Sequence, residues 1–278
     1  MVIQHNIAAI NSYRNLSSNQ SALSKNLEKL SSGYKINRAG DDAAGLAISE
    51  TMRSQINGLN QAVNNANDAV GLIQTAEGAL TETHSMLQRM KTLTTQAANG
   101  TYTTTARNNI KAEIDALRDE ITRIASTTEF NGETPLAPKA GKAKTNPNLT
   151  FFIGASSDKT NQMTVAQQTM TAKALSVDAI LVDNTANALK SMKTIDNAIE
   201  KVSSYRATLG AAQNRLEHTV NNLKVTSENI TSAESRIRDT DMADEITAYT
   251  KNNILLQAAQ SMLSQSNAMP QGVLSMLQ

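Results

Sequence analysis

The chain has 278 residues, of which 40% are hydrophobic but only 3% are aromatic, and it contains neither tryptophan nor cysteine. Its 26 basic and 25 acidic residues nearly cancel and form no basic block, which argues against a nucleic-acid or membrane-surface partner. The three histidines, His5, His84 and His218, are far apart in sequence, so neither cysteine-based nor clustered-histidine metal sites are expected. A core of leucine, isoleucine, alanine and methionine favours helices packed on helices.

The first 15 residues lack the cationic head, the continuous apolar stretch and the small-residue cleavage motif of a secretory signal. No stretch of the chain is apolar over a length that could span a bilayer. We therefore expect no cleaved signal peptide and no transmembrane span, and a different export route if the protein leaves the cell.

Apolar residues at seven-residue spacing predict one long helix at the beginning of the chain. These residues are Val2, Ala9, Leu16, Leu23 and Leu30. Gly33 stands where a helix C-terminus favours glycine, so we expect the helix to end there. The first 24 residues hold a single fully charged side chain, Arg14, so this helix is apolar on one face and uncharged on the other.

A hinge is expected after this helix, where Gly33, Gly40 and the pair Asp41–Asp42 interrupt the helical pattern beside Arg38. The two aspartates could indicate carboxylate chemistry or a cation site. Capping of the next helix, worth about 1 kcal/mol, explains them more simply because they directly precede a helical pattern.

A second long helix is predicted over residues 43–98, and a shorter amphipathic helix follows over 110–124. The second helix carries a heptad stripe of Leu59, Ala66, Ile73, Leu80 and Leu87. From Asn131–Gly132 onward the composition changes, and residues 149–153 and 163–166 are typical of a small β-hairpin. The helical pattern resumes near Thr185.

The longest apolar repeat lies in the C-terminal third and has the seven-residue period of a coiled coil. Its members are Ile195, Val202, Leu209, Leu216, Leu223, Ile230 and Ile237. We expect the first part of this stripe to be covered by the two preceding helices of the same chain.

The last helix is predicted to begin near Met242, and Lys251 is the final charged residue of the chain. Residues 252–278 are too polar for a bilayer span and too apolar to be fully solvated. Two charge-poor terminal helices indicate burial on more than one face, which many copies of the same pair would provide, as in a helical filament. The alternative is an ordinary antiparallel coiled coil with a few neutral outer positions.

Five stretches of the chain are distinctive: LEKLSSGYKINRAGDDAAGLAIS, NNANDAVGLIQTAEGALTE, LGAAQNRLEHTVNNL, SRIRDTDMADE and NAMPQGVLSML. They resemble motifs of bacterial flagellins, and the resemblance extends over residues 1–132 and 180–278. The resemblance implies a mainly α fold, a coiled-coil rod with paired N- and C-terminal helices. It also implies a terminal helical domain of residues 1–45 and 236–278 and a rod domain of 46–235. Residues 133–184 are too few for the large outer domains of many flagellins, so the rod itself should form the filament surface.

The same resemblance implies a structural protein, neither an enzyme nor a cofactor binder, that self-assembles into the extracellular flagellar filament for motility. Its implied partners are its own copies, a flagellar export chaperone, and cap and junction proteins, and it would leave the cell through the flagellar secretion apparatus. The residues expected in the filament core are Leu16, Leu23, Leu30, Leu256, Leu263, Val273, Leu274 and Leu277.

A patch on the rod resembles the site that Toll-like receptor 5 recognises on many flagellins. Gln88, Arg89, Leu93 and Glu113 match that site, whereas Thr92 and Thr95 stand where Glu and an apolar residue are usual. The missing acidic residue removes charge-assisted contacts, which would weaken recognition. The simpler interpretation is that Arg89 and Glu113 form a solvated face of the rod. We also expect the same patch to contact a neighbouring subunit within the filament, in which case the receptor would need the free monomer.

Two other functions are compatible with part of the sequence. A hook–filament junction protein shares the terminal helices, but the complete DDAAGLAIS and PQGVLSML motifs favour a filament subunit. A coiled-coil signalling or adaptor protein would need charged outer positions within residues 252–278, and there are none.

Overall fold

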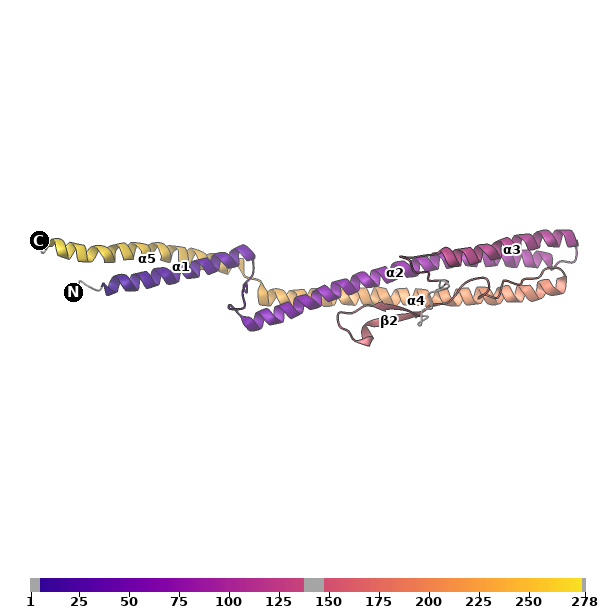
Figure 1. The fold of residues 1–278 in the computed structure, drawn as a ribbon, viewed down its shortest axis with the longest axis horizontal. Helices are drawn as coiled ribbons and strands as arrows, with labels where there is room; N and C mark the ends of the chain where they lie inside the picture. Colours follow the sequence, from indigo (N-terminus) through magenta and orange to yellow (C-terminus); the bar gives the residue numbers. More distant parts are fainter. Residues whose placement is uncertain (1–5, 138–147, 277–278) are drawn as a thin grey trace. The chain divides into compact units, whose positions relative to one another are not determined.

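The computed structural model describes residues 6–137 and 148–276, although several side chains from Pro270 onward lie outside the description. Within these ranges the chain forms five α-helices and one two-stranded sheet (Figure 1). It divides into one compact unit of Met1–Ile56 with Glu228–Gln278 and a second of Asn57–Ser227. Helices α2 (Ala43–Ala97) and α4 (Thr185–Arg238) contribute to both units. The domain boundaries expected for the assembled filament stay a prediction.

In the first unit, α1 (Ile7–Ser32) and α5 (Met242–Met276) lie side by side (Figure 1). Asn6 caps α1 by accepting the backbone N–H of Ala9, and its amide donates to the carbonyl of Ser266 at 2.8 Å. One side chain thus both begins α1 and fixes its register against α5. Gly33 ends α1 in the left-handed region (φ 75°), as the sequence predicted, and its N–H donates to the carbonyl of Lys29.

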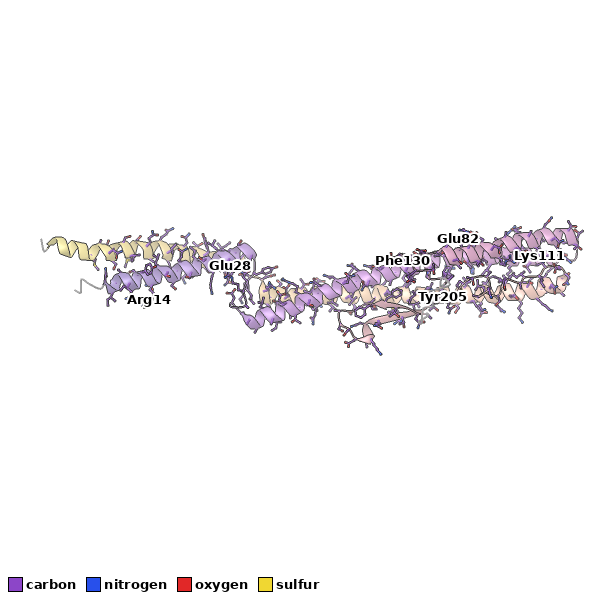
Figure 2. All side chains as sticks on the ribbon, in the orientation of Figure 1. Arg14, Glu28, Glu82, Lys111, Phe130 and Tyr205 are labelled. Carbon is purple, nitrogen blue, oxygen red and sulfur yellow. The ribbon has the colours of Figure 1, made fainter. Side chains whose placement is uncertain are left out.

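In the second unit, α2, α3 (Thr104–Thr127) and α4 pack around one hydrophobic core. The α2 stripe from Leu59 to Leu87 is buried, and so is the α4 stripe from Ile195 to Leu223. Tyr205, labelled in Figure 2, is the largest fully buried side chain of this core. Both stripes were predicted because a seven-residue period keeps one helix face towards its neighbours.

The predicted hairpin is present as β1 (Asn148–Phe152) and β2 (Gln162–Ala166), which pair antiparallel from Asn148↔Ala166 to Phe152↔Gln162. A short 3₁₀ helix, η1 (Lys159–Asn161), precedes β2. The core also includes side chains of the irregular segment between β2 and α4, which no periodic pattern identified. They are Met170, Ala172, Leu175, Val177, Ile180 and Val182.

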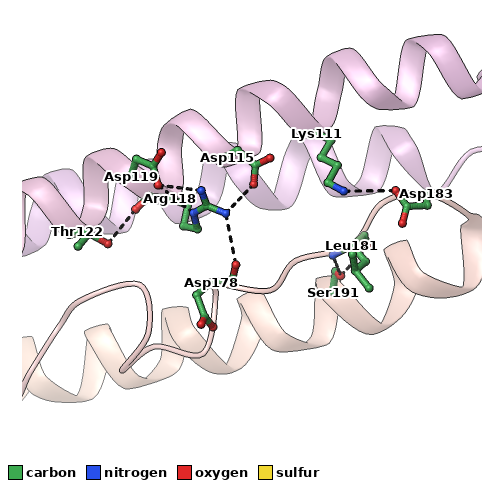
Figure 3. Close-up of polar contacts among 9 residues, drawn as sticks. All are labelled: Lys111, Asp115, Arg118, Asp119, Thr122, Asp178, Leu181, Asp183 and Ser191. Atoms are coloured by element: carbon green, nitrogen blue, oxygen red, sulfur yellow. Dashed lines mark hydrogen bonds and ion pairs between the residues drawn. The ribbon is translucent and has the colours of Figure 1, made fainter.

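Polar contacts hold this irregular segment against α3 and α4 (Figure 3). The Arg118 guanidinium on α3 pairs with Asp115 and Asp119 and donates to the carbonyl of Asp178. The hydroxyl of Ser191 on α4 donates to the Leu181 carbonyl at 2.8 Å and accepts the Leu181 N–H at 3.1 Å. Both backbone groups of Leu181 are thereby satisfied without a partner strand.

In the described part of the chain, no helix is long and apolar enough to cross a membrane. The same residues contain no group of three or more His, Asp or Glu side chains placed to hold a metal ion.

Candidate functional site

The pair formed by α1 and α5 carries the largest set of exposed apolar side chains in the described residues. Several are more than half exposed, among them Ile7 at 66%, Ile254 at 61% and Met262 at 63%. The set on these two helices is Ile7, Ile10, Tyr13, Leu27, Met242, Ile246, Ile254, Leu255, Met262 and Met269. Two helices therefore bury only part of their apolar surface on each other, and the remainder faces outward.

The leucines predicted for the filament core lie on the inward side of this pair. Leu23 is buried, and Leu16, Leu30, Leu256 and Leu263 are half-buried. The side chains of Val273 and Leu274, together with the whole of Leu277, lie outside the described residues. The heptad pattern thus identified the contact between α1 and α5, whereas the outward-facing apolar residues fall outside that pattern.

Residues 33–42, predicted as a hinge, join α1 to α2 without regular structure and contain the predicted cap. Asp42 accepts the N–H of Gly45 at 2.9 Å in the first turn of α2. Asp41 instead accepts the N–H groups of Asn37 and Arg38, and the Arg38 N–H lowers the pKa of the Asp41 carboxyl. Asp42 therefore caps α2 as expected, whereas Asp41 stabilises the backbone of the hinge and does not bond the first turn of the helix.

The other two members of the hinge have modest roles. Arg38 forms an exposed ion pair with Glu28 at 2.8 Å. Gly40 is exposed and has a negative φ, so its backbone does not require glycine. Exposed ion pairs of this kind contribute little to stability.

A cluster that the sequence patterns did not reveal centres on Tyr34. Two arginines lie over its ring, with the guanidinium carbon of Arg238 at 4.9 Å and that of Arg53 at 5.8 Å from the ring centre. Arg53 pairs with Glu234 at 2.8 Å, and Arg238 pairs with Glu50 at 2.6 Å. This Tyr34 cluster combines cation–π contacts with charge-assisted hydrogen bonds from three separate segments.

Backbone bonds reinforce the Tyr34 cluster. The Lys35 N–H donates to the Arg238 carbonyl at 2.6 Å, and the Thr240 N–H donates to the Gly33 carbonyl at 3.0 Å. The hydrogen bond from Arg238 lowers the pKa of Glu50, and the bond to Glu234 raises the pKa of Arg53. The two backbone bonds thus attach the end of α1 to the link between α4 and α5. The pKa shifts favour the charged forms of Glu50 and Arg53 in the same cluster.

The rod patch predicted from Gln88, Arg89, Leu93 and Glu113 is only partly at the surface. Arg89 on α2 forms an ion pair with Glu113 on α3 at 2.8 Å, and both side chains are about half exposed. Gln88 is exposed and bonds the ring of His84, whereas Leu93 is 3% exposed and belongs to the core. The structure brings the polar members together and places Leu93 beneath the surface.

The two threonines that depart from the receptor motif are exposed on the same helix. The hydroxyl of Thr92 donates to the carbonyl of Gln88, and that of Thr95 donates to the carbonyl of Lys91. Both hydroxyls bond to their own helix, and because threonine is neutral neither residue supplies a charge to the patch.

Comparisons with known proteins point in one direction. Residues 3–140 match the bacterial flagellin N-terminal helical region, and residues 192–277 match the C-terminal helical region of the same family. The chain is 52% identical to a flagellin of Bacillus subtilis, with all of both chains covered. It is 47% identical to the flagellar filament 33 kDa core protein of Treponema phagedenis, again over the full length of both.

Among solved structures, the chain resembles a putative flagellar hook-associated protein from Vibrio parahaemolyticus with a TM-score of 0.59. The aligned region covers 72% of this chain and 100% of that one, at 13% sequence identity. At this level of identity the likeness concerns the fold alone.

Proposed function

The chain belongs to the bacterial flagellin family and is a structural, non-enzymatic subunit of the flagellar filament, and we propose that α1 and α5 form its filament core. The observation that carries this proposal is the set of outward-facing apolar side chains on these two helices. The segments concerned are residues 1–45 and 236–278.

Contacts with other subunits account for this surface best. Side chains such as Ile254 and Met262 have no charged neighbours within residues 252–278, so hydration of that face is unfavourable. Identical helices of neighbouring subunits carry the same apolar residues and can cover each other. Repetition of such a contact without closure produces a helical filament.

Assembly of the full chain tests this proposal. We expect the intact protein to form long filaments on seeding or salting-out, as seen by negative-stain electron microscopy. A chain lacking residues 1–45 and 236–278 should remain an unassembled helical monomer, because the apolar faces are gone. Filaments from the shortened chain, or none from the intact chain, would contradict the proposal.

For the rod patch, we propose that the free monomer presents Gln88, Arg89 and Glu113 to Toll-like receptor 5. The support is the exposed Arg89–Glu113 ion pair, which joins α2 and α3 into one surface above Leu93. We expect weaker receptor signalling than from a flagellin with Glu at the position of Thr92, because a charge-assisted contact is missing.

The change Thr92→Glu isolates that contact. It should raise receptor signalling in a reporter-cell assay of monomeric protein. The control for added charge is Thr51→Glu, which changes an exposed threonine of the same helix far from the patch. An unchanged response to the Thr92 variant would count against this explanation.

For export, we propose passage through the flagellar secretion apparatus with an export chaperone, followed by assembly with cap and junction proteins. The support is membership of the flagellin family, whose members form an extracellular filament. Mass spectrometry of filaments sheared from cells should find residues 1–15 intact; a removed N-terminal segment would disprove this route.

A further inference from the structure

The chain has three phenylalanines, and all of them line one groove on the second unit. Phe130 comes from the loop after α3, and Phe151 and Phe152 come from β1. We call this the aromatic groove; its volume is about 290 Å³ and its floor is the α2 surface at Ala69 and Leu72. A volume near the lower end of small-molecule pockets, about 300–1,000 Å³, suits one long side chain.

The wall formed by Phe130 (labelled in Figure 2) is held by a tight turn. Phe130 and Glu133 exchange backbone hydrogen bonds of 2.9 and 3.1 Å around Asn131 and Gly132, whose φ angles are 50° and 82°. Asn–Gly is the pair that such a positive-φ turn favours. The ring itself lies on α2, 3.5 Å from where a Cβ on Gly71 would be. This wall is therefore preorganised.

The opposite wall is attached to α2 through the hairpin. The Asn65 side-chain amide donates to the Phe152 carbonyl at 3.1 Å, and Gln61 in turn donates to the Asn65 carbonyl oxygen at 2.9 Å. Phe151 packs against the core, but the Phe152 ring remains 38% exposed. An exposed aromatic ring beside two others is an apolar surface open to a partner.

The rim of the aromatic groove is acidic. Asp68 and Glu133 both line it, and none of its described lining residues is basic. Asp68 forms no ion pair with any residue in the described ranges. Aromatic faces bind the alkyl stem and the cationic head of Lys or Arg, and a carboxylate at the rim binds the same head. The chemistry of the groove thus matches a basic side chain.

We infer that the aromatic groove receives a Lys or Arg side chain from a second copy of this chain in the filament. Filament subunits are surrounded by identical copies, and the second unit carries exposed basic side chains that form no ion pair within the described residues. They are Lys159, Lys173, Lys190, Lys193, Lys201, Arg215 and Lys224. This inference rests on the filament function but concerns a lateral contact distinct from α1 and α5.

A photo-cross-linker identifies the occupant directly. Full-length protein with p-benzoyl-phenylalanine at Phe152 is assembled into filaments, irradiated and mapped by mass spectrometry. We expect covalent dimers in filaments but not in monomer, joined to a peptide segment next to a Lys or Arg. Filaments that form normally but give no dimer, or a dimer at a segment without a basic residue, overturn the inference and leave the filament function standing.

Two substitutions test the energetic role of the groove. Phe152→Thr and Asp68→Asn should each raise the critical concentration for seeded assembly about threefold or more, because cation–π and carboxylate contacts are lost. Leu181→Thr is the matched control, since it removes an exposed apolar side chain (45%) from a non-helical position of the same unit. Equal critical concentrations for all three variants, with unchanged monomer melting, would overturn the inference. Absence of assembly by the parent chain would instead remove the filament function itself.

Discussion

At the scale of single residues, Gly45 shows how the start of α2 depends on close contact. A Cβ at Gly45 would lie 2.5 Å from Oδ2 of Asp42 and 2.8 Å from Cδ1 of Ile36. Asp42 caps the helix through the Gly45 N–H, and Ile36 is only 3% exposed. The capping carboxylate and a buried side chain therefore occupy the space that any other residue would need.

We predict that Gly45→Ala destabilises the monomer, although alanine is normally better than glycine in a helix by about 1 kcal/mol. Displacing the cap of Asp42 should cost about 0.5–2 kcal/mol and outweigh that gain. Gly78→Ala on the same helix is the control, because nothing lies within 4 Å of a Cβ there. Thermal unfolding followed by circular dichroism should show a lower midpoint for the first variant and an equal or higher one for the second. A gain in both would refute the steric explanation.

At the scale of helices and strands, the sequence predicted what periodicity and capping determine. The helices and the hairpin were found, and the roles of Gly33 and Asp42 were recognised. The exception is the start of α3, which lies at Thr104 and not near residue 110, because its first turns carry no apolar stripe. Regularly spaced apolar residues indicate one buried face, because successive side chains of a helix are separated by a constant angle.

Features that arise from distant segments escaped prediction. The Tyr34 cluster unites residues near 34, 50–53 and 234–238, and no local pattern records that meeting. The segment from Met170 to Val182 is buried without regular structure, so it has no period to detect. Likewise, Leu93 appeared as part of a surface motif, yet it follows the buried stripe of α2 through Met90.

For the terminal helices, we predict that Ile254→Gln weakens assembly without affecting the monomer. Ile254 is 61% exposed in the subunit, so its loss should change the unfolding free energy by no more than about 0.5 kcal/mol. Full burial of an isoleucine side chain is worth about 1.5–3 kcal/mol, so covering the 61% that is still exposed should contribute about 1–2 kcal/mol, or roughly five- to twentyfold in critical concentration.

The control is Leu189→Gln, which removes an equally large apolar side chain (56% exposed) from α4 in the second unit. Sedimentation of seeded assembly reactions gives the critical concentration as the protein left in the supernatant. If Ile254→Gln assembles as readily as the control, the outward face of α5 is not an assembly surface.

At the scale of the whole molecule, ionised carboxylates form charge-assisted contacts in both units. Asp41 binds backbone N–H groups in the hinge, Glu50 pairs with Arg238, and Glu120 pairs with Arg123 on α3. The N–H of Arg38, the side chain of Arg238 and the side chain of Arg123, respectively, lower the pKa of each carboxyl. The folded monomer thus prefers all three in their charged forms.

These pKa shifts predict acid sensitivity of the monomer. A carboxyl whose pKa is lower in the folded than in the unfolded chain stabilises the fold fully above its unfolded pKa, about 3.9–4.3. That stabilisation is lost as the pH falls from there through the folded pKa. The melting midpoint should therefore decrease between pH 6 and pH 3. Because these carboxyls are exposed, salt should reduce the effect.

The Glu50→Gln variant tests which groups cause this decrease. It removes the charge that pairs with Arg238, so it should lower the midpoint at pH 6 and narrow the difference between pH 6 and pH 3. Glu82→Gln, at an exposed position of α2 labelled in Figure 2, should leave that difference unchanged, because Glu82 forms no ion pair within the described ranges. If both variants show the same difference in midpoint between pH 6 and pH 3 as the parent, the ion pair of Glu50 with Arg238 has no part in the pH dependence. The decrease would then belong to Asp41 and Glu120, or to a general accumulation of positive charge.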